Sequence, residues 1–126
     1  MKKLFFLSLL LIVLTSCKVS QNSRSIDPKG NYFEVKEGKT FEIQFTTNAS
    51  LGYAWMWENE KAVSIVESLD SRYVDNNPPG IVGASVQRFW NFRGKEKGTD
   101  TLRFNYCRAN DPSTSIETRA VVVKVK

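Results

Sequence analysis

Strict two-residue alternation of apolar and polar side chains is the feature that most constrains the fold of this chain. In the segment 40–46 the three large apolar side chains share one face: Phe41, Ile43 and Phe45. The same period recurs in segments 101–107 and 117–125. A period of two places successive side chains on opposite faces of a β-strand, whereas an amphipathic helix needs a period of 3.6. The sequence therefore predicts an all-β chain whose strands each turn one face toward a core.

Five weaker strand patterns complete the expected set: 31–36, 53–58, 62–68, 70–75 and 85–93. Turn signals rich in Gly, Asn, Asp and Pro separate the segments, as in the run from Asn76 to Gly80. Because no segment keeps a helical period over three turns, we expect about seven or eight strands and no long helix. Short strands separated in this way favour a β-sandwich or a β-barrel.

The first sixteen residues are interpreted as a signal peptide rather than as part of the fold. Two lysines precede an apolar run from Leu4 to Leu14, which is shorter than a membrane-spanning helix requires. The run ends in Leu14-Thr15-Ser16-Cys17, the small-residue pattern that precedes the lipidated Cys of bacterial lipoproteins. We therefore predict a signal peptide over 1–16 and a lipid anchor on Cys17. An ordinary secretory signal that is cut nearby is the alternative.

Residues 17–30 are predicted to form the lipidated Cys and a flexible tether, which leaves 31–126 as a single domain. The segment after Cys17 contains Ser, Asn, Gln, Pro and Gly and few apolar side chains. Lipidation would hold the protein at the bacterial cell envelope, on the periplasmic or the outer surface of a membrane. Loss of Lys2 and Lys3 with the signal peptide would lower the formal net charge from +5 to +3. This mild basicity could favour an acidic partner or an anionic membrane surface, but it is more often typical of solubility alone. We expect a monomer.

Histidine is absent from the sequence, and its absence excludes whole classes of chemistry. A Ser-His-Asp triad, a Cys-His pair and a His-based metal site all require it. A lipidated Cys17 would leave Cys107 without a disulfide partner, so Cys107 is interpreted as a small strand residue. Carboxylate pairs such as Glu58 and Glu60 fit a solvated surface. We therefore expect no enzymatic activity, no metal and no cofactor.

Basic and aromatic residues interleave between Arg88 and Lys97, a composition that could stack on and neutralise a nucleic acid. Export to the envelope argues against such a ligand. The segment also fits a core strand that leads into a charged turn, and this interpretation is favoured. No nucleic-acid partner is expected.

Three segments between predicted strands carry the candidate binding site. They comprise Asn48, Ala49, Ser50, Leu51, Gly52 and Tyr53 in the first, Gly83, Ala84 and Ser85 in the second, and Arg108, Ala109 and Asn110 in the third. Loops at one end of a β-sandwich can act together as one binding surface. Gly52 permits backbone conformations that other residues disfavour, and Asn48 can bond its own backbone. Taken singly, each segment also fits an ordinary connection.

The ordered set, with Gly52-Tyr53-Ala54-Trp55 at its start, resembles the chagasin family of inhibitors of papain-like cysteine proteases. The resemblance extends from about Phe33 to the C-terminus. It implies an immunoglobulin-like β-sandwich whose three loops enter the substrate cleft of the protease, with the first loop covering the catalytic Cys. Trp55 would match a residue in the core or behind the first loop. Inhibition of this kind is reversible and needs no catalytic group in the inhibitor.

The chain departs from the family pattern at several loop positions. Ala49 stands where the family has Pro, Leu51 replaces Thr, Ala84-Ser85 replaces paired Gly, and Asn110 replaces Trp. We expect a changed target preference or weaker binding to papain-like enzymes as the result. Trp57 and Trp90 are candidates for supplying the missing aromatic contact.

The alternative function is that of an immunoglobulin-like envelope lipoprotein that binds another protein or a carbohydrate. An exposed platform of Trp55, Trp57 and Trp90 would favour it, because flat aromatic faces stack on ligands. Burial of Trp55 and Trp57 in the core would count against it.

Overall fold

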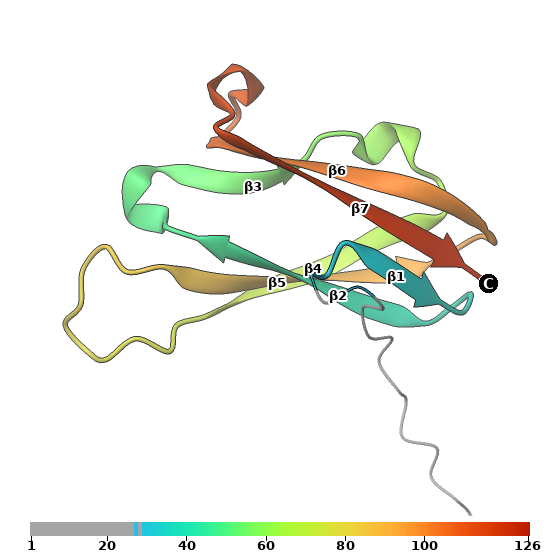
Figure 1. Ribbon diagram of the computed structural model, residues 1–126, viewed down its shortest axis with the longest axis horizontal. Coiled ribbons are helices and arrows are strands. Elements are labelled where there is room, and N and C mark those ends of the chain that lie inside the picture. The colour runs from blue at the N-terminus through green and yellow to red at the C-terminus, as the bar shows by residue number, and fades with distance from the viewer. Residues whose placement is uncertain (1–26, 28) are drawn as a thin grey trace, which may run out of the picture.

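Seven β-strands in two sheets form the computed structural model, which describes residue 27 and residues 29–126 (Figure 1). The strands are β1 (Tyr32–Val35), β2 (Thr40–Thr47), β3 (Tyr53–Trp57), β4 (Val66–Val74), β5 (Val86–Gly94), β6 (Gly98–Arg108) and β7 (Glu117–Val125). Three single 3-10 turns join them: η1 (Ala49–Leu51), η2 (Glu60–Ala62) and η3 (Pro112–Thr114). The predicted all-β, immunoglobulin-like sandwich is confirmed, with seven strands.

The two sheets have the strand orders β1-β7-β6-β3 and β2-β5-β4. Every pairing is antiparallel except β1 with β7, which is parallel. The chain changes sheet after β1, after β2, after β3 and after β5, so strands that follow one another in sequence often face one another across the core. This alternation between layers is what makes the fold a sandwich rather than a meander.

The core consists of the inward-facing residues of the strictly alternating strands. Phe41, Ile43 and Phe45 of β2 are each at most 1% exposed, as the alternation predicts. Aromatic rings fill much of the space, with the ring centre of Phe45 lying 4.8 Å from Phe104 and 5.0 Å from Trp55. Tilted and edge-on ring pairs at such distances stabilise a core beyond the area they bury.

One predicted boundary is wrong, because segments 62–68 and 70–75 form a single strand, β4, that starts only at Val66. Ser68 pairs with Phe92 and Asp70 pairs with Asn91, which leaves Leu69 as an extra residue on β4. Such a bulge reverses which side chains point inward, so the sequence pattern looks like two strands. The predicted start at residue 62 fails because Ala62 belongs to η2.

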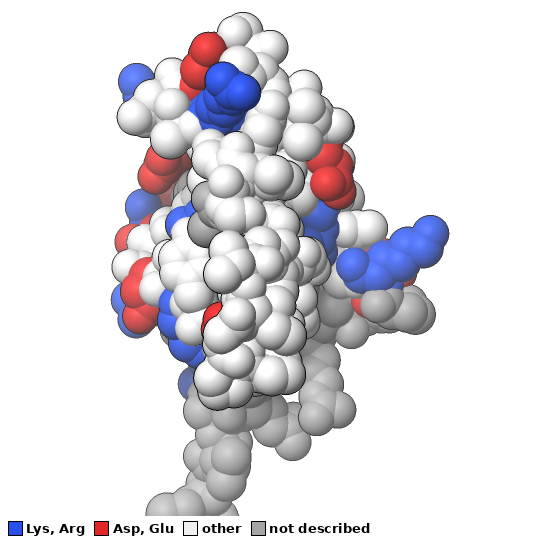
Figure 2. Space-filling view, turned by 90° about the vertical axis from the view of Figure 1, so that its left-hand side faces the viewer, with Lys and Arg blue, Asp and Glu red and all other residues white. Residues whose placement is uncertain are grey.

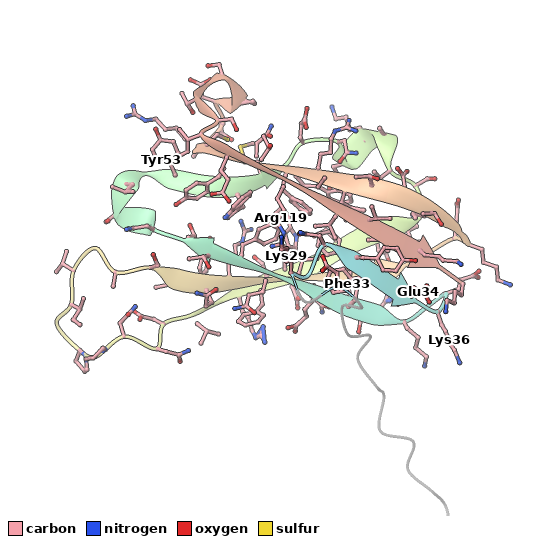
Figure 3. All side chains as sticks on the ribbon, in the orientation of Figure 1. Lys29, Phe33, Glu34, Lys36, Tyr53 and Arg119 are labelled. Carbon is pink, nitrogen blue, oxygen red and sulfur yellow. The ribbon has the colours of Figure 1, made fainter. Side chains whose placement is uncertain are left out.

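The N-terminal side of the described chain is attached to the sandwich through Arg119, near the start of β7. Arg119 donates from Nη2 to the carbonyl oxygen of Gly30 (2.7 Å) and from Nε to Oδ1 of Asn31 (2.9 Å). Asp27 accepts from the backbone N–H groups of Lys29 and Asn31, and Figure 3 shows Lys29 beside Arg119. The described chain is thus bonded to the domain from residue 27, within the segment predicted as a tether.

The predicted signal peptide (1–16) and the predicted lipidation site at Cys17 lie outside the described residues. Among residues 27 and 29–126, no helix has the length and apolar character needed to cross a bilayer.

Candidate functional site

Three connections gather at one end of the sandwich, on the left in Figure 1. We name them the first loop (48–52), between β2 and β3, the second loop (75–85), between β4 and β5, and the third loop (109–116), between β6 and β7. They meet because β2, β4 and β6 run toward this end and β3, β5 and β7 run away from it. All three predicted segments therefore lie at a single end, which we call the loop end.

Asn48 organises the first loop from inside. Its side-chain Oδ1 accepts from both the backbone N–H of Ser50 (3.2 Å) and the Ser50 hydroxyl (2.6 Å). Its carbonyl oxygen accepts from the N–H of Leu51 (3.3 Å), closing the η1 turn. An Asn side chain that bonds two residues ahead stabilises a turn locally, as the sequence analysis predicts for Asn48.

Asn48 also joins the first loop to its neighbours. The side-chain amide Nδ2 donates to the carbonyl oxygen of Gly83 in the second loop at 2.8 Å. The backbone N–H of Asn48 donates to the hydroxyl of Tyr106, a β6 residue that is only 8% exposed, at 2.9 Å. The first and second loops are therefore bonded to each other, and the first is bonded to a core strand.

Gly52 ends the first loop in a left-handed backbone conformation, with φ of +74°. A Cβ atom added there would meet no other atom within 4 Å, so the need for glycine comes from the backbone and not from crowding. Gly83 in the second loop has φ of +81°, so its backbone also favours glycine. Both glycines of the candidate site thus shape their loops.

The second loop is braced at its base. Asn77 donates from Nδ2 to Oδ1 of Asp75 (2.8 Å) and to the carbonyl oxygen of Ser85 (2.9 Å), which links the two sides of the loop. Ser85 is exposed and Ala84 is half-buried. These bonds hold the base of the loop and leave its tip to project from the molecule (Figure 1).

The third loop is closed by its own polar groups. The hydroxyl of Thr114 donates to the carbonyl oxygen of Asp111 (2.7 Å) and accepts from the N–H of Arg108 (2.9 Å). The Asp111 carboxylate accepts from the N–H of Ser113 and caps η3. Asn110 has φ of +63°, the one non-glycine residue with positive φ in the described chain. Asn tolerates this conformation better than most residues.

Arg108 and Tyr53 connect the third loop to the first. They pair across β6 and β3, and the guanidinium carbon of Arg108 lies 5.8 Å from the centre of the Tyr53 ring. Figure 3 shows Tyr53 at the loop end, below the third loop. The structure therefore brings Tyr53, Arg108 and the first loop together from segments far apart in the sequence.

Comparison with known proteins shows to which family the chain belongs. Residues 34–125 match the model of the chagasin family, peptidase inhibitors of group I42. The chain belongs to the chagasin family. The resemblance drawn from the loop motifs is confirmed, and the family consists of inhibitors, not enzymes.

Two solved structures show the same fold as this chagasin-family chain. A cysteine protease inhibitor from Entamoeba histolytica, EhICP2, is 20% identical, with a TM-score of 0.59 over 75% of this chain and 86% of that chain. Amebosin is 22% identical, with a TM-score of 0.60 over 82% of this chain and 95% of that chain. A comparison with curated proteins finds no match.

The aromatic replacements considered for the missing family Trp do not lie at the loop end. Trp57 is 8% exposed and is the last residue of β3, at the end of the strand away from the first loop. Trp90 is half-buried in the middle of β5, where its Nε1 donates to the Ser68 hydroxyl (2.6 Å). Trp55 is 5% exposed and donates to the carbonyl oxygen of Thr46 behind the first loop. A tryptophan stacking platform is therefore absent from the described surface, which counts against the alternative function.

The loop end carries exposed aliphatic side chains, of which the sequence analysis singled out only Leu51. Leu51 is 60% exposed, and Ile81 and Val82 in the second loop are 55% and 93% exposed. Figure 2 looks onto this end and shows few charged side chains over its centre. The one available signal was the presence of two neighbouring aliphatic residues in a loop rich in Pro and Gly, since such loops are usually polar.

Among the residues that the structure describes, no cluster of His, Cys, Asp and Glu could hold a metal ion. Cys107 is a free, fully buried thiol whose Sγ lies 3.4 Å from Sδ of Met56. Burial raises the pKa of this thiol, and the negative charge of Asp111 adds to the effect. A thiol held protonated and away from solvent is a poor nucleophile, so Cys107 has the structural role predicted for it.

Proposed function

We propose that this protein is a reversible inhibitor of papain-like cysteine proteases and that its three loops occlude the active-site cleft. The observation that carries the proposal is the loop end itself, where hydrogen bonds and a ring contact join three loops in a chain of the chagasin family. The relative EhICP2, described as a cysteine protease inhibitor, supports the choice of target class.

The proposed mechanism needs positioning and no chemical step. Loops that are bonded together before they meet the protease lose little conformational entropy on binding, so more of the contact energy appears as affinity. The contacts of Asn48 to Tyr106 and Gly83 supply this preorganisation for the first and second loops. The absence of histidine agrees with inhibition by occlusion.

Inhibition constants of the purified protein against a panel of papain-like proteases test the proposal. We expect slowed hydrolysis by some members and weaker inhibition by Gly52→Glu and Arg108→Glu, which place a carboxylate or reverse a charge at the loop end. Lys36→Glu, in the exposed turn at the opposite end, is the matched control and should leave inhibition unchanged (Figure 3). If no cysteine protease is slowed or bound by the wild-type protein, the proposal fails.

We further propose that Cys17 is lipidated and holds the inhibitor at the bacterial cell envelope. The sequence pattern from Leu4 to Cys17 supports this part of the proposal. Expressed in a bacterial host, the wild-type protein should partition into a detergent phase and carry a diacylglycerol mass on Cys17. Cys17→Ser should remain in the aqueous phase. Equal partitioning of the two proteins, or a mature N-terminus at another residue, would contradict the anchor.

A further inference from the structure

Resting on the proposed function, we propose that Leu51, Ile81 and Val82 determine which proteases this inhibitor binds. In this proposal the three side chains enter apolar subsites of the protease, and the third loop supplies little of the affinity. The preferred targets are then cysteine proteases whose substrate clefts accept aliphatic side chains.

The first step is the exposure of these side chains. Val82 is 93% exposed, Leu51 60% and Ile81 55%, whereas the aliphatic residues of the core are at most 8% exposed. Scattered apolar residues on a surface need no explanation, but a group at one end with few charges around it marks a binding surface (Figure 2).

The second step is the contact between the two loops that carry them. Asn48 bonds the carbonyl oxygen of Gly83, and the position of a Cβ atom on Gly83 would lie 3.8 Å from Oγ of Ser50. Leu51 follows Ser50 in the chain and Val82 precedes Gly83. The aliphatic residues are thus close in the chain to the point at which the first and second loops touch, so a partner that covers this point would meet both loops.

The third step is that the third loop has no large apolar side chain at Ala109 and Asn110. Its tip consists of Ala109 and Asn110, and its Asp111 and Thr114 side chains bond within the loop. The left-handed backbone of Asn110 disfavours a large side chain at this position. Ile116 is 64% exposed, but it lies at the base of the loop, where its N–H bonds the carbonyl oxygen of Tyr106.

The chemistry of the three side chains then defines the target. An aliphatic group gains free energy in an apolar pocket and none in a pocket lined by charges, because the charges would lose their water. A single methylene in an apolar pocket changes discrimination by roughly 10–200-fold. A protease that prefers aliphatic residues in its peptide substrates should therefore be inhibited more strongly than one that prefers charged residues.

The experiment measures inhibition constants of the full chain and its variants against proteases sorted by their cleavage preference on fluorogenic peptides. Leu51→Ser and Val82→Ser should each weaken inhibition by about tenfold. Leu69→Ser is the matched control, an exposed aliphatic residue on β4 outside the three loops, and should change inhibition by less than about threefold. Ile116→Ser, on the third loop, should weaken inhibition less than either Leu51→Ser or Val82→Ser. Because all four positions are exposed, thermal unfolding should be nearly unchanged.

The inference is overturned if Leu51→Ser and Val82→Ser inhibit as well as wild type, or if Leu69→Ser or Ile116→Ser weakens inhibition equally. It is also overturned if wild type inhibits charge-preferring proteases as strongly as aliphatic-preferring ones. Each of these outcomes leaves the proposed function standing, since the wild-type protein would still be an inhibitor. Failure of the wild-type protein to inhibit any protease would remove the proposed function itself.

Discussion

The hydroxyl of Tyr106 shows how one core residue can control a loop. Its ring packs among aromatic neighbours, 5.1 Å from Trp55 and 5.6 Å from Tyr53, while its oxygen accepts from the N–H of Asn48. Asn48 in turn bonds Ser50 and Gly83. A single buried side chain therefore fixes the residue from which the contacts of the first loop extend.

Tyr106→Phe tests this arrangement with little change in packing. It leaves the N–H of Asn48 without its acceptor, and loss of such a bond typically costs about 0.5–1.5 kcal/mol. We expect inhibition to weaken roughly 2- to 10-fold if that bond positions the first loop. Tyr73→Phe, at a residue that is 58% exposed, is the control. Equal inhibition constants for Tyr106→Phe and wild type would show that the bond does not position the loop.

Asn110 illustrates a departure from the family pattern that has a backbone cause. Asn110→Trp, the residue that the resemblance implied for this position, would place a large side chain at φ of +63°, a conformation that costs about 1–2 kcal/mol for most residues. We expect a loss of unfolding free energy of about this size in urea, and no loss for Asn110→Gly. A stable Asn110→Trp protein would mean that the third loop can adopt another conformation.

At the scale of strands, the sequence predicted most where alternation is unbroken. Segments 40–46 and 117–125 became β2 and β7 almost residue for residue, because buried faces specify strand register strongly. β4 was divided in two because the bulge at Leu69 reverses its faces. The contact of Asn48 with Gly83, 35 residues away, has no local pattern and emerges only from the packing of the two sheets.

The β1–β7 pair predicts how stability depends on pH. On β1, Glu34 accepts a hydrogen bond from the Tyr32 hydroxyl and pairs with Lys126, which follows β7. The contact with Lys126, followed by that with Tyr32, lowers the pKa of the Glu34 carboxyl. The unfolded chain therefore takes up a proton more readily, so the contribution of Glu34 is complete above its unfolded pKa and is lost as the pH falls through its folded pKa.

The free energy of unfolding in urea, measured from neutral pH down through the pH at which Glu34 takes up its proton, tests this pH dependence. The unfolding free energy of Glu34→Gln should fall less steeply with pH than that of wild type, because the titrating carboxylate is gone. Glu60→Gln, in the exposed turn η2, controls for the loss of one negative charge. Parallel pH profiles for Glu34→Gln and wild type would exclude a role for Glu34 in acid stability.

For the molecule as a whole, the sandwich separates two regions. The first region is the loop end. The second is the site where the N-terminal side of the described chain joins β7: Arg119 donates to the side chain of Asn31, and the N–H of Val122 donates to its carbonyl oxygen. For the aliphatic residues of the second loop, the sequence offers only their position in a loop rich in Pro and Gly, whereas the bond from Asn77 to Ser85 that braces the loop appears only in the structure.

Cys107 offers a readout of whole-molecule unfolding. It is fully buried and burial raises the pKa of its thiol, so a thiol reagent should reach it only when the domain opens. In a Cys17→Ser background we expect slow labelling that accelerates strongly with Leu102→Ala, a core truncation that typically costs about 2–5 kcal/mol. Rapid labelling of the folded protein would show that the sheet opens locally around Cys107.

The η1 turn has a consequence for how this protein survives contact with its target. A protease cuts a chain that lies extended along its cleft, and exposed loop tips are the usual sites of nicking. In the first loop, the 3-10 turn over Ala49–Leu51 is closed by the bond from the Leu51 N–H to the Asn48 carbonyl. This backbone cannot be drawn out into an extended strand without breaking the bonds that Asn48 accepts from Ser50 and Leu51. We therefore expect the first loop to fill a cleft without being cut there.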